Sequence, residues 1–128
     1  GLPLGADLET VEPRDPALVR TFFTDREAAD IAALSPRLQP HAVALRWSAK
    51  EAVLKALGLG LRLDTRAIEV RSGDIDRMAP PERLPSASAE WQPLDVRIAA
   101  TIPGAPVQPA VTWRDLGGRV VTVALWPG

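Results

Sequence analysis

The sequence contains no cysteine among its 128 residues, and it has a single histidine, His41, and a single methionine. Without cysteine the chain has no disulfide scaffold, no zinc site built on thiolates and no thiol nucleophile. A transition-metal site is disfavoured as well, because such sites draw mainly on histidine and cysteine. His41 ends a proline-containing segment, residues 35–41, that we predict to be a linker. We interpret this histidine as structural rather than as part of a catalytic dyad or triad.

Long apolar runs and concentrated charge are also missing. No stretch approaches the ~20 apolar residues that span a bilayer, and no charged-then-apolar leader is visible. The net charge is −1 and the basic residues are scattered, unlike the basic surface of a nucleic-acid-binding protein. We therefore expect a cytoplasmic protein that binds neither nucleic acid nor a membrane.

The length of the chain predicts one domain with a single hydrophobic core. Because the sequence begins with Gly1, we expect residues 1–128 to be a fragment or one lobe of a longer protein. Helix signals dominate the first half: Asp15-Pro16 is a typical helix start, and Thr24 to Glu27 form a capping box. The second helix is expected to bury a stripe of apolar residues, namely Ala28, Ile31, Ala32 and Leu34.

Strand signals dominate the second half of the chain, after a predicted loop over residues 72–90. Alternating apolar residues predict one strand over residues 94–100, and Asp115 to Gly118 predict a β-hairpin turn. The predicted strands cover residues 2–8, 67–71, 94–100, 110–114 and 119–125. We expect an α+β fold in which an antiparallel sheet packs against a long helix and shorter helices.

The longest helix is predicted over residues 42–57, ending at Gly58-Leu59-Gly60. It carries a face of small residues that can approach a sheet closely, namely Ala49, Ala52, Val53 and Ala56. Glu51 and Lys55 lie four residues apart and share another face. Only two of the fifteen basic residues are lysines, Lys50 and Lys55, and both are in this helix. The use of lysine only in this helix indicates that a compact ammonium group, and not a planar guanidinium, is needed there.

Asp7 and Glu9 project from the same side of the first predicted strand, whereas Ala6 and Leu8 are expected to point into the core. The paired acids have an ordinary interpretation as a solvated strand end. Their other interpretation is chemical: if the long helix crosses this strand, Asp7 and Glu9 meet Glu51. A few hard oxygen ligands with room for water and phosphate are typical of a magnesium site in phosphoryl transfer.

The charges of such a site balance only when an anion arrives. Lys50 and Lys55 would neutralise phosphate oxygens that the metal does not reach. Three carboxylates, two lysines and a dication sum to −3 + 2 + 2 = +1, so a diphosphate is the natural counterpart.

Three segments together resemble a known family: Gly5-Ala-Asp7-Leu-Glu9, then Phe22-Phe23-Thr24 with Glu27, then Trp47-Ser-Ala-Lys50-Glu51 through Lys55 to Gly60. They resemble the signature of the 4′-phosphopantetheinyl transferase superfamily, closely from Gly5 to about Val70 and loosely beyond. The Asp-x-Glu form and the terminal hairpin look like the C-terminal half of the larger, surfactin-synthetase-activating type. The resemblance implies a 4′-phosphopantetheinyl transferase-like fold.

The resemblance also implies a reaction and roles. Such enzymes move the phosphopantetheine arm of coenzyme A to a serine of an acyl or peptidyl carrier protein, with magnesium. Asp7, Glu9 and Glu51 would hold Mg²⁺ on the diphosphate. Glu51 would also help to deprotonate the serine, Lys55 would stabilise or protonate the leaving phosphate, and Lys50 would contact the diphosphate.

Partners follow from the same resemblance. Residues 11–24 would lie where the family meets its carrier protein. This makes Phe22 a candidate partner contact, although Phe22 and Phe23 can instead plug the junction between two helices. The larger type has a second homologous half, so we expect a second lobe or a homo-oligomer, and weak or no activity for an isolated monomer.

Two other functions remain open from the sequence. The chain can be a non-catalytic lobe that keeps the signature but only docks a carrier protein or another lobe. It can also be a magnesium-dependent diphosphate hydrolase, which would release bisphosphate without any carrier protein.

Overall fold

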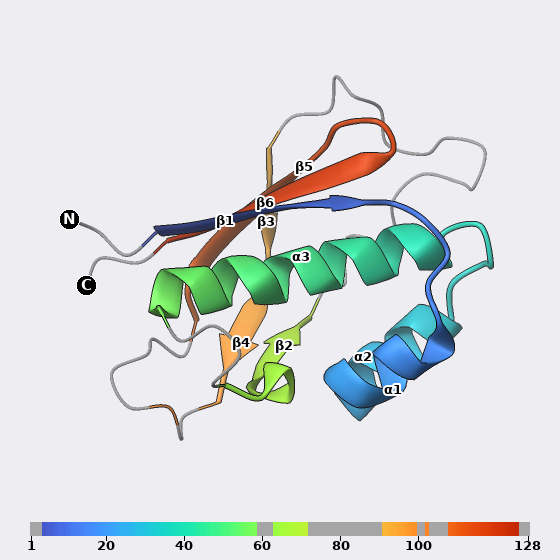
Figure 1. Ribbon diagram of the computed structural model, residues 1–128, viewed down its shortest axis with the longest axis horizontal. Coiled ribbons are helices and arrows are strands. Elements are labelled where there is room, and N and C mark those ends of the chain that lie inside the picture. The colour runs from blue at the N-terminus through green and yellow to red at the C-terminus, as the bar shows by residue number, and fades with distance from the viewer. Residues whose placement is uncertain (1–3, 59–62, 72–90, 100–101, 103–107, 126–128) are drawn as a thin grey trace.

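The computed structural model describes residues 4–58, 63–71, 91–99, 102 and 108–125 (Figure 1). Several predicted features lie outside the described residues, namely the loop 72–90, residues Leu59 and Gly60 after the long helix, most of segment 103–109, and Trp126. In chain order the elements are β1 (Leu4–Thr10), α1 (Pro16–Phe22), α2 (Asp25–Ala32), α3 (Gln39–Leu57), the 3₁₀ turn η2 (Thr65–Ala67), β2 (Ile68–Val70), β3 (Gln92–Leu94), β4 (Val96–Ile98), β5 (Ala110–Asp115) and β6 (Arg119–Leu125).

The long helix α3 lies across an antiparallel sheet with the strand order β1-β6-β5-β3, and α1 and α2 sit at one end of that helix (Figure 1). A separate two-stranded sheet pairs β2 with β4. The predicted α+β architecture is confirmed. Among the described residues, no helix is long and apolar enough to cross a membrane.

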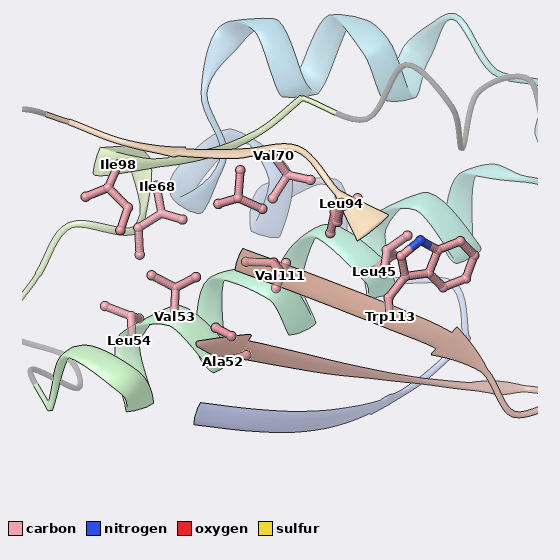
Figure 2. Packing of buried hydrophobic residues seen from close by; sticks show 13 residues of the cluster. Leu45, Ala52, Val53, Leu54, Ile68, Val70, Leu94, Ile98, Val111 and Trp113 are labelled. Atoms are coloured by element: carbon pink, nitrogen blue, oxygen red, sulfur yellow. The ribbon is translucent and has the colours of Figure 1, made fainter. Parts of the chain in front are cut away.

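The core forms between α3 and the strands, as the small-residue face predicts. Ala49, Ala52 and Val53 are fully buried, and larger side chains from the strands fill the space around them. Figure 2 shows the side chains of α3 directed at those of Ile68 and Val111. Small residues on the helix let its backbone approach the sheet, so the strands supply most of the side-chain volume.

The start of α3 differs from the prediction. The helix begins at Gln39, so His41 lies in its first turn and not in a linker. Proline is tolerated there because the first helical N–H groups have no partner within the helix, which explains why Pro40 does not delay the start. His41 is buried with its ring edge-on to Trp113, at 5.9 Å between ring centroids, as expected of a structural residue.

The predicted helix starts and the hairpin are confirmed. The side chain of Asp15 caps α1, and Thr24 and Glu27 form a complete capping box at α2. The predicted buried stripe of α2 is only partly correct, because Ile31 is buried whereas Ala32 is exposed. Asp115 and the glycines Gly117 and Gly118, both with positive φ, form the turn between β5 and β6.

The strand predicted over residues 94–100 is in fact two short strands in different sheets. The chain changes direction at Asp95, between β3, which pairs with β5, and β4, which pairs with β2. The carbonyl of Asp95 accepts a hydrogen bond from Arg71 N–H, and its carboxylate pairs with Arg97. Alternation persists through this bend, so the hydrophobic pattern alone cannot reveal it.

Candidate active site

Gly5 sets how closely β1 and α3 pack. A Cβ atom at position 5 would lie 2.0 Å from the carbonyl oxygen of Ala52 and 2.5 Å from the nitrogen of Ala56. Only glycine permits this approach, so α3 covers the face of β1 to which residue 5 belongs. Asp7 and Glu9 follow at alternate positions on the same face. The strand therefore directs its two acids toward the helix.

This packing corrects the predicted orientation of β1. Ala6 and Leu8 were expected in the core, but Ala6 is exposed and Leu8 is 50% exposed. A helix covers one face of a strand, and here that face is chosen by the glycine rather than by the larger apolar residues. Leu8 instead lies on the outer face of the sheet, opposite α3.

Asp7 is fixed at both its backbone and its side chain. Its carbonyl accepts a hydrogen bond from Ser48 Oγ at 3.2 Å, and Ser48 Oγ lies 2.9 Å from Thr122 Oγ1 on β6. Its Oδ1 atom lies 2.9 Å from Lys55 Nζ, which also donates to the carbonyl of Ala6. The Asp7 side chain is 9% exposed, and its Oδ2 atom is buried without a hydrogen-bond partner. This oxygen is available to a cation.

Glu9 and Glu51 complete an acidic cluster with Asp7. Burial raises the pKa of Glu9 to about 7, with further increases from the neighbouring carboxylate of Asp7 and from repulsion by Glu51, and only Arg14 opposes. Burial also raises the pKa of Glu51, followed by repulsion from Asp7, whereas Lys55 lowers it. The three carboxylates therefore lie near enough to repel one another, and their negative charge is only partly compensated.

Lys55 is the cation that faces this cluster. Its pKa is raised, first by the hydrogen bond to Asp7 and then, against desolvation, by the charges of Asp7, Glu51 and Glu9. Its side chain is 52% exposed, so the ammonium reaches both the acids and the solvent. A half-exposed ammonium on a flexible stem can exchange a carboxylate partner for an incoming anion.

The acids have the chemistry that Mg²⁺ requires, namely hard oxygens, one of them buried and without a partner. Within the described ranges, however, no group of three or more Asp, Glu, His or Cys side chains has an arrangement suited to holding a metal ion. Lys55 occupies one oxygen of Asp7 instead. Asp7, Glu9 and Glu51 are therefore the right type of ligand for Mg²⁺ and lie near one another. Their side chains would have to turn to bind one ion together.

Lys50 is in a different place from the one predicted. Its side chain is completely buried, its Nζ atom lies 2.7 Å from Oε1 of Glu27, and it donates to the carbonyls of Thr65 and Ile68. Burial lowers its pKa, although the charge of Glu27 opposes this. The expected contact between Lys50 and a diphosphate is contradicted, because this ammonium faces the core beside α2 and β2, away from the acids.

The two phenylalanines have different roles. Phe23 is 2% exposed and packs with Ile31 and Val43, so it fills the helix junction as the structural interpretation expects. Phe22 is 37% exposed, and its ring meets that of Trp47 edge-on at 5.3 Å. Phe22 therefore has the exposure that a partner contact needs.

Sequence reasoning missed two features of this region. Ser48 fixes the backbone of Asp7, and its signal was a small polar residue directly before the small-residue face of the long helix. An apolar groove of about 530 Å³ also opens between α1, α2 and the start of α3, with Arg14 and Arg20 among its lining residues. Arg14 lies 3.7 Å from Glu9, so the groove begins beside the acidic cluster.

The chain has an α+β fold in which β1, with Asp7 and Glu9, packs on α3, with Glu51 and Lys55. This combination indicates the class of protein to which the chain belongs. The family model of the 4′-phosphopantetheinyl transferase superfamily matches residues 3–101, and the chain belongs to this superfamily.

Particular relatives support this assignment. The chain is 33% identical over 72 residues to a 4′-phosphopantetheinyl transferase of Bacillus subtilis, covering 56% of this chain and 32% of that protein. It is 50% identical over 44 residues to a holo-(acyl-carrier-protein) synthase of Chloroflexus aurantiacus, covering 34% of this chain and 32% of that protein. The matches thus span about a third of each curated relative.

Two solved structures share the fold. The acyl carrier protein synthase of Mycobacterium tuberculosis is 25% identical with a TM-score of 0.60, and each chain covers 100% of the other. The holo-(acyl-carrier-protein) synthase of Thermotoga maritima is 14% identical with a TM-score of 0.66, covering 98% of this chain and 63% of that one. The second likeness concerns the fold alone.

Proposed function

We propose that this chain carries the catalytic residues of a transferase that moves the 4′-phosphopantetheine arm of coenzyme A to a serine of an acyl or peptidyl carrier protein. The carrier would serve fatty acid, polyketide or nonribosomal peptide synthesis. The observation that supports this most is the 2.9 Å ion pair between Asp7 and Lys55 where β1 runs along α3 (Figure 1), with Glu9 and Glu51 near enough for the charge of Asp7 to raise their pKa values. Membership of the superfamily gives that cluster its chemical context.

Asp7, Glu9 and Glu51 would hold Mg²⁺. Support comes from the buried, unpartnered Oδ2 atom of Asp7 and from the raised pKa values of Glu9 and Glu51, which a cation would bring down. When bound, the metal would neutralise and orient the diphosphate of coenzyme A.

Glu51 and Lys55 would act on the reacting groups. The serine oxygen forms a bond to the phosphorus that bears pantetheine, and the bond from that phosphorus to the adenosine 3′,5′-bisphosphate leaving group breaks. Glu51, directly or through a water, takes the serine proton, which suits a partly buried carboxylate with a raised pKa. Lys55 stabilises or protonates the departing phosphate once it releases Asp7.

The carrier protein would contact residues 11–24. The apolar groove beside α1 and the exposed ring of Phe22 supply apolar contact surface there. Arg14 and Arg20 supply positive charge at the same place, next to the acidic cluster. Apolar anchors with a charged rim are typical of surfaces that bind partner proteins.

A second lobe of the same fold would cover the outer face of the sheet. On this face Leu4, Leu8 and Val121 are apolar, and the two leucines are 61% and 50% exposed. Antiparallel sheets usually present polar residues on an uncovered face. The matches also span only about a third of the curated relatives. Size measurement by light scattering separates a homo-oligomer of this chain from a lobe on a longer polypeptide.

The test is transfer from a fluorescent coenzyme A to an apo carrier protein, with and without Mg²⁺, using the complete protein. The proposal expects labelling that requires Mg²⁺ and disappears when Glu51 is replaced by alanine. Carrier binding without labelling would instead identify a non-catalytic docking lobe. Release of bisphosphate without carrier would identify a hydrolase. Because the proposed reaction uses coenzyme A, we also propose a cytoplasmic location, which cell fractionation would check.

A further inference from the structure

The buried ion pair between Lys50 and Glu27 has no part in the proposed chemistry, yet both of its side chains make several hydrogen bonds in the core. The carboxylate of Glu27 accepts hydrogen bonds from Thr24 N–H at 2.9 Å and Val70 N–H at 3.0 Å. The ammonium of Lys50 bonds Glu27 and the carbonyls of Thr65 and Ile68, which satisfies its three donors. Both side chains have 0% exposure.

This pair joins elements that are distant in sequence. Glu27 lies in the first turn of α2, Lys50 lies past the middle of α3, and the carbonyl partners belong to η2 and β2. The ammonium also lies 5.4 Å from the ring centre of Phe23, between α1 and α2. Groups from α2, η2 and β2 therefore all bond the Nζ atom of Lys50. A rotation of α3 about its axis would break most of these bonds.

Rotation of α3 matters because the next residue is Glu51. Successive residues of a helix are separated by about 100° around the axis. Lys50 therefore faces the Glu27 network while Glu51 faces Asp7 on β1. Close packing at Gly5 fixes how near the helix lies to β1, and the bonds of Lys50 hold another side of the same helix.

We propose that Lys50 and Glu27 are positioning residues that set the rotation of α3 and thereby direct the Glu51 carboxylate at Asp7. Buried ion pairs often add little stability compared with apolar pairs of similar volume, whereas their directed bonds can fix one arrangement. The proposal rests on the proposed function for the meaning of the site, but the geometry that it predicts can be measured without turnover.

The test uses the complete protein with any partner lobe. Changing one member leaves a buried charge unpaired and is expected to impair folding, so the informative variant is the combined Glu27→Gln/Lys50→Met change. Val111→Ala is the matched control, because it opens a cavity in the core at a residue that is 3% exposed and outside the ion pair. Each protein is assayed at a temperature at which melting curves show that it is folded.

Two readouts distinguish positioning from general stability. We expect the combined change to lower kcat about tenfold and to weaken Mn²⁺ binding, measured by electron paramagnetic resonance, while KM for the carrier stays constant. Val111→Ala should lower the melting temperature without changing either quantity per folded molecule. A folded combined variant with unchanged kcat and Mn²⁺ affinity would overturn the proposal.

A double-mutant cycle tests whether the pair acts through Glu51. In a Glu51→Gln background the combined change should alter kcat by less than about twofold, because the group that it directs is already gone. An undiminished loss in that background would refute positioning through Glu51. If the wild-type protein binds Mn²⁺ but transfers nothing, the proposed function fails, and the Mn²⁺ affinities still decide whether Lys50 and Glu27 orient the acids.

Discussion

Lys55 Nζ lies 2.9 Å from Asp7 Oδ1, and this ion pair joins the long helix to the first strand. Asp7 keeps its other carboxylate oxygen buried and unpartnered. Under the proposed function this pair would open, with a divalent cation taking the place of the ammonium on Asp7 and Lys55 turning to the phosphate of coenzyme A.

Replacing Lys55 should separate catalysis from stability. The ion pair is half exposed on its lysine side, so Lys55→Met is expected to change the free energy of unfolding by less than about 1 kcal/mol. Transfer should fall by about 10²-fold, because the leaving phosphate loses its charge partner. Urea unfolding and single-turnover transfer measure the two effects. An equal loss from Arg37→Met, a surface cation outside the cluster, would contradict the assigned role.

Replacing Glu51 by glutamine should slow turnover strongly without unfolding the protein. Glu51→Gln removes one of three repelling carboxylates, so the melting temperature should stay constant or rise. The transfer rate should fall by about 10²–10⁴-fold, the range for loss of a general base. Asp30→Asn on α2 is the control and should leave the rate unchanged. Normal transfer by the folded Glu51→Gln protein would rule out the proposed base.

Adding one methyl group at Gly5 should disturb both packing and site. The new Cβ atom would lie 2.0 Å from a backbone oxygen of α3, which cannot rotate away, so strand and helix must separate. Gly5→Ala should destabilise the protein by about 1–3 kcal/mol, as overpacking does. Ala6→Val, on the exposed face of the same strand, should cost less than about 0.5 kcal/mol. Guanidinium unfolding of both variants would reveal the difference, and equal stabilities would argue against close packing at Gly5.

His41 should make the protein less stable in mild acid. Burial lowers its pKa below the usual 6.5, with Asp115 opposing, so the folded protein resists a proton that the unfolded chain accepts. The destabilising effect of His41 is absent above about pH 6.5, where the histidine is neutral in both states. Its effect grows as the pH decreases from there toward the lowered pKa of His41 in the folded state. Protonation of Glu9, whose pKa is raised to about 7, should stabilise the folded protein over the same range, so the effect of His41 is measured as a difference between two proteins. Between pH 7.5 and pH 5.5 the urea midpoint of the wild-type protein should fall relative to that of His41→Gln. A constant difference between the two midpoints would contradict this assignment.

The sequence predicts the helices, the hairpin and the general fold because their signals are local. The caps of α1 and α2 and the glycine turn at residues 117–118 depend on neighbouring residues, which the sequence displays directly. The division of residues 94–100 into two strands depends on pairing with β2 and β5, which lie elsewhere in the chain.

The site was predictable in part for the same reason. The sequence predicted that Asp7 meets Glu51 only on the condition that the long helix packs across the first strand, and the family resemblance implied a shared role for them. The face of β1 that meets the helix depends on the backbone approach at Gly5. Lys50 and Lys55 look alike in sequence, five residues apart on one helix. Only the position of Glu27, on another helix, shows that the first is a buried structural cation and the second faces the acids.

The most direct test of the account is calorimetric titration of the protein with coenzyme A, with and without Mg²⁺. It shows whether Asp7, Glu9 and Glu51 bind a metal ion that also contacts the diphosphate. In the complete protein we predict that Mg²⁺ strengthens coenzyme A binding by about tenfold or more. The Asp7→Asn/Glu51→Gln variant, shown to be folded by its melting curve, should lose that gain. A gain of equal size in the variant, or none in the wild-type protein, would contradict the account.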